Sequence, residues 1–255
     1  MKVYSLINQK GGVSKTTTAA ELWAGLNARG KKALAIDLDP QGNFTYHAGA
    51  RGDSKTAFGL LTREATAAEA IQHTANGDFI AASQALAGAD TTITETGKEY
   101  RLKEALAPLP ALGYDYVIID TPPELGILTI NALTASDSVI IPALADVFSL
   151  QGIEKLSHTM QTVRTYCNKD LTIAGLLITK YNPRTLLSQS IASSLTELAR
   201  KLGTKVFNTT IREGVTVREA QLKQMSLRTY APNAKVTEDY DAFIEELLTA
   251  EREEA

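Results

Sequence analysis

Short apolar runs alternate with helix-patterned segments along almost the whole chain, and this alternation restricts the fold more than any other feature of the sequence. The run YDYVIID at 114–120 is apolar on both faces, as a strand in the middle of a parallel sheet requires. Helical patterns separate such runs, for example over 15–29, where apolar residues recur three and four positions apart. This order predicts a doubly wound α/β fold, a mostly parallel twisted sheet with helices on both faces.

The other elements fit the same architecture. We predict strands at 3–7, 33–37, 79–83, 138–142, 171–179 and 205–208, helices at 98–109, 125–135, 150–167, 186–202, 215–224 and 237–250, and a long loop over 40–60 that enters a short helix. The 255 residues, 44% of them hydrophobic, suffice for one core, and no repeat or linker divides them, so we expect a single domain over 1–255. In such sheets, ligands bind where the strands end.

The loop after the first strand, NQKGGVSKTTTA at 8–19, deviates from a general phosphate-binding loop. That loop reads G-x-x-x-x-G-K-[ST], but Gln9 and Ser14 occupy the glycine positions here, while Lys15 and Thr16 match. A loop that enters a helix offers backbone N–H groups and the positive end of the helix dipole to phosphate. A surface loop rich in Gly and Lys is the alternative, and the position between strand and helix argues against it. We therefore expect Lys15 to contact phosphates and the Thr16 hydroxyl to coordinate Mg²⁺.

Two further strand-end loops carry carboxylates. DLDPQGN at 37–43 holds Asp37 and Asp39, of which we expect one to face the phosphates, where it would order the waters of Mg²⁺ or orient an attacking water. The residues alone do not decide which one, and an Asp-Pro turn would give the same pattern. In VIIDTPP at 117–123, Asp120 ends a buried apolar strand, which is costly unless a cation such as Mg²⁺ lies beside it.

Together these motifs resemble the ParA/Soj type of the ParA–MinD group of deviant Walker ATPases, over essentially the whole chain. The resemblance rests on KGGVSKTT at 10–17, DLDPQGN at 37–43, VIIDTPP at 117–123, and IREGVTVREAQ at 211–221 followed by YAP at 230–232. It implies that Lys10 is the family's signature lysine, which crosses an ATP-bound dimer to the partner's phosphates. It also favours Asp39 over Asp37 as the catalytic-water aspartate.

The site implied by the resemblance binds ATP and Mg²⁺. Its phosphate-binding residues are Lys10, Gly11, Gly12, Val13, Ser14, Lys15, Thr16 and Thr17; its metal-site residues are Thr16, Asp39 and Asp120; its catalytic residues are Lys10, Lys15 and Asp39. Ser14 departs from the family's usual glycine, and a positive φ there would cost of order 1 kcal/mol. The family's adenine contacts come from loops matching 180–183 and 208–215, where Thr209 and Thr210 replace a frequent proline.

The implied function is DNA partition. ATP drives homodimer formation, the dimer binds nucleoid DNA without sequence preference, and a ParB-like partner stimulates hydrolysis, so the expected location is cytoplasmic and nucleoid-associated. Because the first strand begins at residue 2 or 3, we expect no N-terminal DNA-binding extension.

The charge distribution indicates where DNA would bind. Residues 180–230 carry nine Lys and Arg against three acids, whereas 231–255 carry eight acids against Lys235 and Arg252. Such a basic section is typical of a polyanion-binding surface, although a solvated surface gives the same count. Our candidate DNA contacts are Arg184, Arg218, Lys223 and Arg228, with Arg212 ranked lower.

The alternatives are a membrane regulator, a metabolic relative and a positioner of non-DNA cargo, and the first two have their own sequence requirements. A MinD-type membrane regulator needs a basic amphipathic C-terminal helix, but the end EDYDAFIEELLTAEREEA is acidic, so we expect no membrane partner. Iron–sulfur relatives need several cysteines, and this chain has only Cys167, while a small-molecule synthetase would not need Lys10. A positioner of non-DNA cargo would share every motif.

Overall fold

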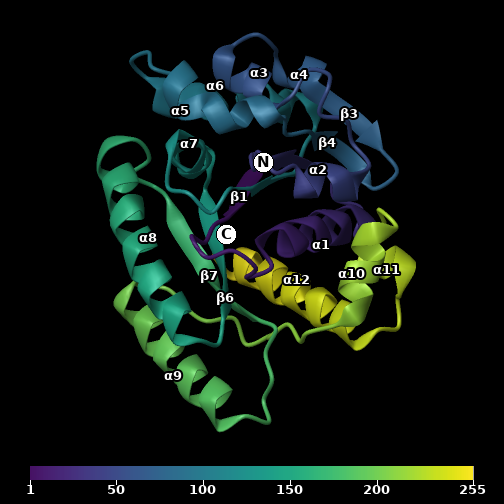
Figure 1. Ribbon diagram of the computed structural model, residues 1–255, viewed down its shortest axis with the longest axis vertical. Coiled ribbons are helices and arrows are strands. Elements are labelled where there is room, and N and C mark those ends of the chain that lie inside the picture. The colour runs from purple at the N-terminus through teal and green to yellow at the C-terminus, as the bar shows by residue number, and fades with distance from the viewer. Residues whose placement is uncertain (255) are drawn as a thin grey trace.

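The apolar runs form one seven-stranded sheet in the order β3-β4-β2-β5-β1-β6-β7 (Figure 1). The computed structural model describes residues 1–254. The strands are β1 (Lys2–Leu6), β2 (Ala33–Asp37), β3 (Ile71–Thr74), β4 (Gly77–Ile80), β5 (Tyr116–Asp120), β6 (Ser138–Leu144) and β7 (Thr172–Thr179). Every neighbouring pair is parallel except β3 with β4 at one edge. The predicted doubly wound, mostly parallel α/β fold is confirmed.

Helices cover both faces of this sheet (Figure 1). They are α1 (Lys15–Ala28), α2 (Asn43–Ala48), α3 (Ala57–Thr62), α4 (Ala67–Ala70), α5 (Ala89–Thr92), α6 (Arg101–Leu106), α7 (Ile127–Ala135), α8 (Val147–Tyr166), α9 (Leu186–Lys201), α10 (Val215–Leu222), α11 (Leu227–Tyr230) and α12 (Lys235–Glu254). Short 3₁₀ helices cover Gln84–Gly88, Lys98–Tyr100 and Leu109–Leu112. Along residues 1–254, no helix combines the length and the apolar character that crossing a bilayer requires.

The central strand β5 shows why the sheet needs helices on both sides. Tyr116 and Ile118 belong to the core shared with α1 and α12, whereas Val117 and Ile119 belong to the core on the opposite face, shared with α3, α6 and α7. Alternate residues of a strand point to opposite faces, so a strand that is apolar at every position must be covered twice. This arrangement packs α1 between the sheet and α12, and so fixes the position of the loop that precedes α1.

Five local predictions were wrong or incomplete. The segment 205–208 forms no strand, because its pairing with β7 is a single isolated bridge between Leu176 and Val206. The strand predicted at 79–83 lies at Gly77–Ile80, since its pairing with β2 ends at Ile80. The antiparallel partner β3, the helix α2 inside the predicted 40–60 loop and the helix α11 were not predicted. All three are short, with four to six residues, so periodicity carries little signal for them.

Candidate functional site

The loop between β1 and α1 is fixed to the ends of two other strands. The Asn8 side chain accepts a hydrogen bond from the Lys10 N–H (3.0 Å) and donates one to the carbonyl of Pro142 in β6 (2.7 Å). The Thr179 hydroxyl at the end of β7 donates to the carbonyl of Val13 (3.1 Å). The loop is therefore held in one shape by strands that are distant in the sequence.

This shape leaves backbone donors free. Gly12 and Ser14 have φ values of 75° and 66°, and a Cβ added at Gly11 or Gly12 would meet no atom within 4 Å. Within the described part of the chain, the N–H groups of residues 11–14 have no hydrogen-bond partner. They lie directly before the N-terminus of α1, where the helix dipole favours negative charge. An anion with several oxygens, such as a phosphate group, fits this arrangement.

Ser14 adopts the left-handed conformation that we considered for this position. Its side chain makes no capping hydrogen bond to α1, so nothing local offsets the cost of a positive φ at a residue with a Cβ. The loop therefore stores strain of about 1 kcal/mol, which the surrounding contacts hold in place.

Lys15 is the cation of the loop. The residue is only 8% exposed, and burial lowers the pKa of its ammonium group, while the carboxylates of Asp120, Asp39 and Glu124 oppose this shift. Its Nζ approaches the carbonyl of Lys10 (3.5 Å). A buried cation surrounded by three acids and open to a cavity is well placed to receive phosphate oxygens.

Asp120 and Thr16 meet at the carboxyl edge of the sheet. The Thr16 hydroxyl donates to Asp120 Oδ2 (2.6 Å), while Asp120 Oδ1 is buried and has no hydrogen-bond partner among residues 1–254. Burial raises the pKa of Asp120 well above its ordinary value, Asp37 adds to this, and Thr16 and Lys15 oppose it. An unsatisfied buried carboxylate oxygen beside a hydroxyl fits a divalent cation.

This cation site is sparse in protein ligands. Among residues 1–254, no group of three or more His, Cys, Asp and Glu side chains is arranged to hold a metal ion. Magnesium in nucleotide sites commonly takes one or two carboxylates together with waters and substrate phosphates. The donor set therefore fits Mg²⁺ delivered with a phosphate ligand.

The structure separates the two aspartates of the second loop. Asp37 is fully buried and accepts hydrogen bonds from the Thr45 N–H and hydroxyl (both 2.8 Å) and from the Asp39 N–H (2.9 Å). Burial raises the pKa of Asp37 to about 6, against these three hydrogen bonds. Asp39 lines the cavity beside the phosphate loop. Asp37 thus braces the loop, and the geometry favours Asp39 for a role toward a bound ligand.

Lys10 points elsewhere. Its ammonium group forms an ion pair with Asp146, which also caps α8 by accepting from the Ser149 N–H (2.9 Å), and it lies 5.6 Å from the ring centroid of Phe148. Neither Lys10 nor the buried Val13 side chain lines the cavity. Sequence reasoning missed Asp146 and Phe148. The only available signal was their position just after a predicted strand, at the same sheet edge as the loop.

The cavity has a volume of about 650 Å³, within the range of small-ligand sites. The phosphate loop and Asp39 form one side, and the other side includes Lys180 and the segment from Ile211 to Gly214, which match the loops expected near adenine. Arg218 and Gln221 of α10 also line it, and these two contributions were not predicted.

The four candidate DNA contacts do not form one cluster. Arg218, Lys223 and Arg228 are exposed on or near α10 and α11, whereas Arg184 is exposed before α9, which lies in a different part of the view from α10 (Figure 1). Arg228 forms an ion pair with Asp241 of α12. The lower-ranked Arg212 pairs with Asp239 of α12 (2.7 Å). Part of the basic section is therefore neutralised by the acidic end of the chain.

Comparison with known proteins agrees with this site. A family model described as an AAA domain matches residues 1–173. The sporulation initiation inhibitor protein Soj of Bacillus subtilis is 39% identical over 244 residues, 94% of this chain and 95% of that protein. The chromosome-partitioning ATPase Soj of Thermus thermophilus is 38% identical over 250 residues, 98% of this chain and 96% of that protein.

A solved structure extends the comparison to three dimensions. The cobyrinic acid a,c-diamide synthase of Mycobacterium smegmatis with bound ADP and magnesium is 32% identical, with a TM-score of 0.86 over 100% of this chain and 97% of that chain. The family model, the identity to two Soj proteins over nearly their full length and the phosphate loop agree: the chain belongs to the ParA/Soj family of P-loop ATPases.

Proposed function

We propose that the protein binds ATP with Mg²⁺, hydrolyses it, and uses this cycle to partition DNA. One observation carries the nucleotide site: the loop with free N–H groups at 11–14, the buried Lys15 and Thr16 border one cavity, and the Thr16 hydroxyl bonds to the half-satisfied Asp120 behind it. The free N–H groups would hold phosphate oxygens, and Lys15 would contact the terminal phosphates. Thr16 and Asp120 would hold Mg²⁺, which neutralises charge on the phosphates when it is bound. Asp39, at the cavity wall, would orient the attacking water.

Dimer formation is the second part of the proposal. Lys10 lies outside the cavity of its own chain, which supports a role toward the phosphates of a second copy. In that dimer Lys10 would leave Asp146. If the homodimer forms only with ATP, the bound nucleotide controls every binding surface that is built from two copies of the chain.

DNA binding and a ParB-like partner complete the proposed cycle, in the cytoplasm and at the nucleoid. The exposed Arg218 and Lys223 support DNA binding, because no ion-pair partner accompanies either of them within residues 1–254. Arg184 stays a candidate on a separate surface, and Arg228 is a weaker one since Asp241 neutralises it. A partner that stimulates hydrolysis would return the dimer to monomers and release DNA.

The alternatives lose support for different reasons. The apolar face of α12, including Phe243, Ile244 and Leu247, is buried in the core, so it is not free to enter a membrane. The synthase activity named for the Mycobacterium smegmatis structure gives no role to Lys10, and the two Soj proteins are more similar in sequence. A positioner of non-DNA cargo differs only in the absence of DNA binding.

The test is DNA binding over a salt series with ATP, ADP and no nucleotide. We expect binding only with ATP, without sequence preference, and with a steep loss of affinity as salt rises. Arg218→Ala/Lys223→Ala should lower the log–log salt slope by roughly four units, because each protomer of the dimer loses two phosphate contacts and each contact contributes about one unit. The matched control Arg200→Ala/Lys201→Ala removes the same charge from the end of α9 and should leave the slope unchanged. Equal binding without ATP contradicts the cycle, and no binding in any state favours non-DNA cargo.

A further inference from the structure

One stripe of α1, the helix that follows the phosphate loop, faces the C-terminal segments of the chain. Its members are Thr17, Glu21 and Gly25, which are spaced four residues apart and therefore lie on one side of the helix, and Arg29, which caps the end of α1 four residues further on. The stripe begins at the nucleotide cavity, which Thr17 lines, and ends at the far end of α1.

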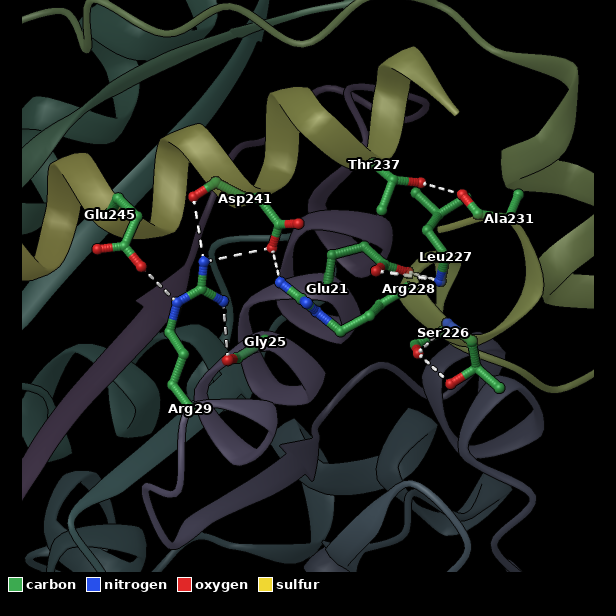
Figure 2. Close-up of polar contacts among 11 residues, drawn as sticks. Glu21, Gly25, Arg29, Ser226, Leu227, Arg228, Ala231, Thr237, Asp241 and Glu245 are labelled. Carbon is green, nitrogen blue, oxygen red and sulfur yellow. Dashed lines mark hydrogen bonds and ion pairs between the residues drawn. The ribbon is translucent and has the colours of Figure 1, made fainter. Parts of the chain in front are cut away.

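Each member of the stripe meets a different part of the C-terminal region. Gln221 of α10 donates to the Thr17 hydroxyl (3.0 Å), and the Leu227 N–H at the start of α11 donates to both carboxylate oxygens of Glu21 (3.0 and 3.2 Å). Figure 2 shows Glu21 pointing from α1 to Leu227.

The far half of the stripe fixes α12. Arg29 donates to Glu245 (2.7 Å) and Asp241 (3.3 Å), as Figure 2 shows. Gly25 packs so closely against Ile244 that an added Cβ would lie 2.3 Å from Ile244 Cδ1. These contacts hold α12 independently of Glu21.

The helix α10 has few apolar contacts of its own, although just after it Gln224 donates to the Tyr46 carbonyl (2.8 Å) and accepts from Asn76 (3.2 Å). Ala220 is its one buried residue, and Leu222 at its end is 71% exposed. Its position depends on the turn into α11, where Leu227 is buried and Ser226 caps the helix by accepting from the Thr229 N–H (3.3 Å). Apolar burial of α10 alone is thus too small to fix its orientation, and polar contacts at its ends decide it.

We propose that Glu21 is a positioning residue that holds α10 and α11 on the nucleotide-binding helix, so that Arg218 and Gln221 stay at the cavity wall. The inference rests on the proposed nucleotide site. It assigns a task to a carboxylate that is 6% exposed, touches no part of the cavity and has no role in the proposed hydrolysis. Burial of a carboxylate costs free energy, and the hydrogen bonds from the Leu227 N–H to Glu21 offset part of this cost.

The groups around Glu21 make the contact sensitive to pH. Asp241 and Tyr240 face it from α12, Arg228 faces it from α11, and Leu227 N–H bonds to it. Burial raises the pKa of Glu21 to about 8, Asp241 adds to this, and the Leu227 N–H and Arg228 oppose it. As the pH rises through this value, the ionised carboxylate gains more from water than from its buried position, which favours opening of the α11 end.

The experiment combines hydrogen exchange of the 215–230 segment with affinity for a fluorescent ATP analogue at pH 7. Glu21→Ala leaves the Leu227 N–H buried without an acceptor, so amides in 215–230 should exchange about tenfold faster or more, and nucleotide affinity should fall several-fold. Glu21→Gln keeps a carbonyl acceptor and should retain both properties. The matched control Glu245→Ala removes an acid from the separate contact between Arg29 and α12 and should change neither.

Several outcomes would overturn the inference. One is a folded Glu21→Ala protein with wild-type exchange over 215–230, and another is faster exchange with unchanged nucleotide affinity. Should Glu21→Ala not fold, the comparison moves to Glu21→Leu, which fills a similar volume but offers no acceptor to the Leu227 N–H. Wild-type exchange over 215–230 in that variant refutes the positioning role. If the wild type itself does not bind the analogue, the proposed function fails, while exchange over 215–230 still decides whether Glu21 holds α10 and α11.

Discussion

Replacement of Glu21 by glutamine should make the protein less sensitive to alkaline pH. The carboxyl group is buried between α1, α11 and α12, and its pKa of about 8 lies well above the ordinary value of 4.5. Between these two values the folded chain holds a proton that the unfolded chain has released. The stabilising contribution of Glu21 is therefore fully present below about pH 4.5 and is lost as the pH rises through 8.

The size of the effect follows from this one proton. Each pH unit inside the window changes the free energy of unfolding by about 1.4 kcal/mol, so the wild type should lose about 2 kcal/mol between pH 6 and pH 8 from this group. Glutamine has nearly the same shape, keeps an acceptor for the Leu227 N–H and carries no titrating proton. The difference in unfolding free energy between variant and wild type should thus shift by about 2 kcal/mol in favour of Glu21→Gln.

The assay is urea unfolding of both proteins at pH 6, 7 and 8 without nucleotide. Asp37, whose pKa is about 6, titrates in both proteins, so its contribution cancels in the difference. Glu245→Gln, at a carboxylate that is mostly exposed, serves as the control and should follow the wild type. Parallel pH curves for wild type and Glu21→Gln would refute the argument, because they would show that Glu21 is already ionised at pH 6 in the folded state.

Four further outcomes test the nucleotide site. Lys15→Ala should lose binding of a fluorescent ATP analogue by a hundredfold or more, of order 3 kcal/mol, and unchanged affinity would mean that the phosphates bind elsewhere. Asp39→Ala should bind Mg-ATP but hydrolyse it at least about a hundredfold more slowly in a phosphate-release assay, whereas normal turnover would reassign the catalytic-water role. Lys10→Ala should bind ATP but fail to dimerise in light scattering. Asp146→Asn keeps the α8 cap but loses the charge that pairs with Lys10, so it should dimerise at lower protein concentration than the wild type. Wild-type dimerisation of both variants would reject the role of Lys10 across the dimer. Ser14→Gly should raise the free energy of unfolding by roughly 0.5–1 kcal/mol in urea by relieving the positive φ, and a loss of stability would show that the hydroxyl has a partner role.

The different roles of Asp37 and Asp39 show how much of the site could be predicted from the sequence. Asp37 and Asp39 follow the same strand two residues apart, and the residues alone left both open. The choice depends on Thr45, which lies on α2, a six-residue helix that periodicity did not reveal. Once Thr45 and the Asp39 N–H satisfy the buried Asp37, only Asp39 is left at the cavity.

The basic section gives a second example. The count of nine cations against three acids was correct, but it treated residues 180–230 as one surface. In the folded chain the acidic residues of α12 lie beside the basic section, so that Arg212 pairs with Asp239 and Arg228 pairs with Asp241. Arg184 lies just before α9, which is apart from α10 in Figure 1. Charge along a sequence therefore overstates charge on a surface wherever a later segment packs against it.

The sequence by itself determined the parallel strands of the sheet, the long helices between them and the three strand-end loops that carry Lys15, Asp39 and Asp120. These features follow from local periodicity and from the rule that parallel strands end at one edge of the sheet, so predicting them requires no knowledge of distant contacts. Tertiary structure alone decided the pairing of Lys10 with Asp146 and of Glu21 with Leu227, which are 136 and 206 residues apart. Such pairs exist because the packing of α8 and α11 against the rest of the fold brings together residues that are distant in the sequence, and no local pattern encodes which residues will meet.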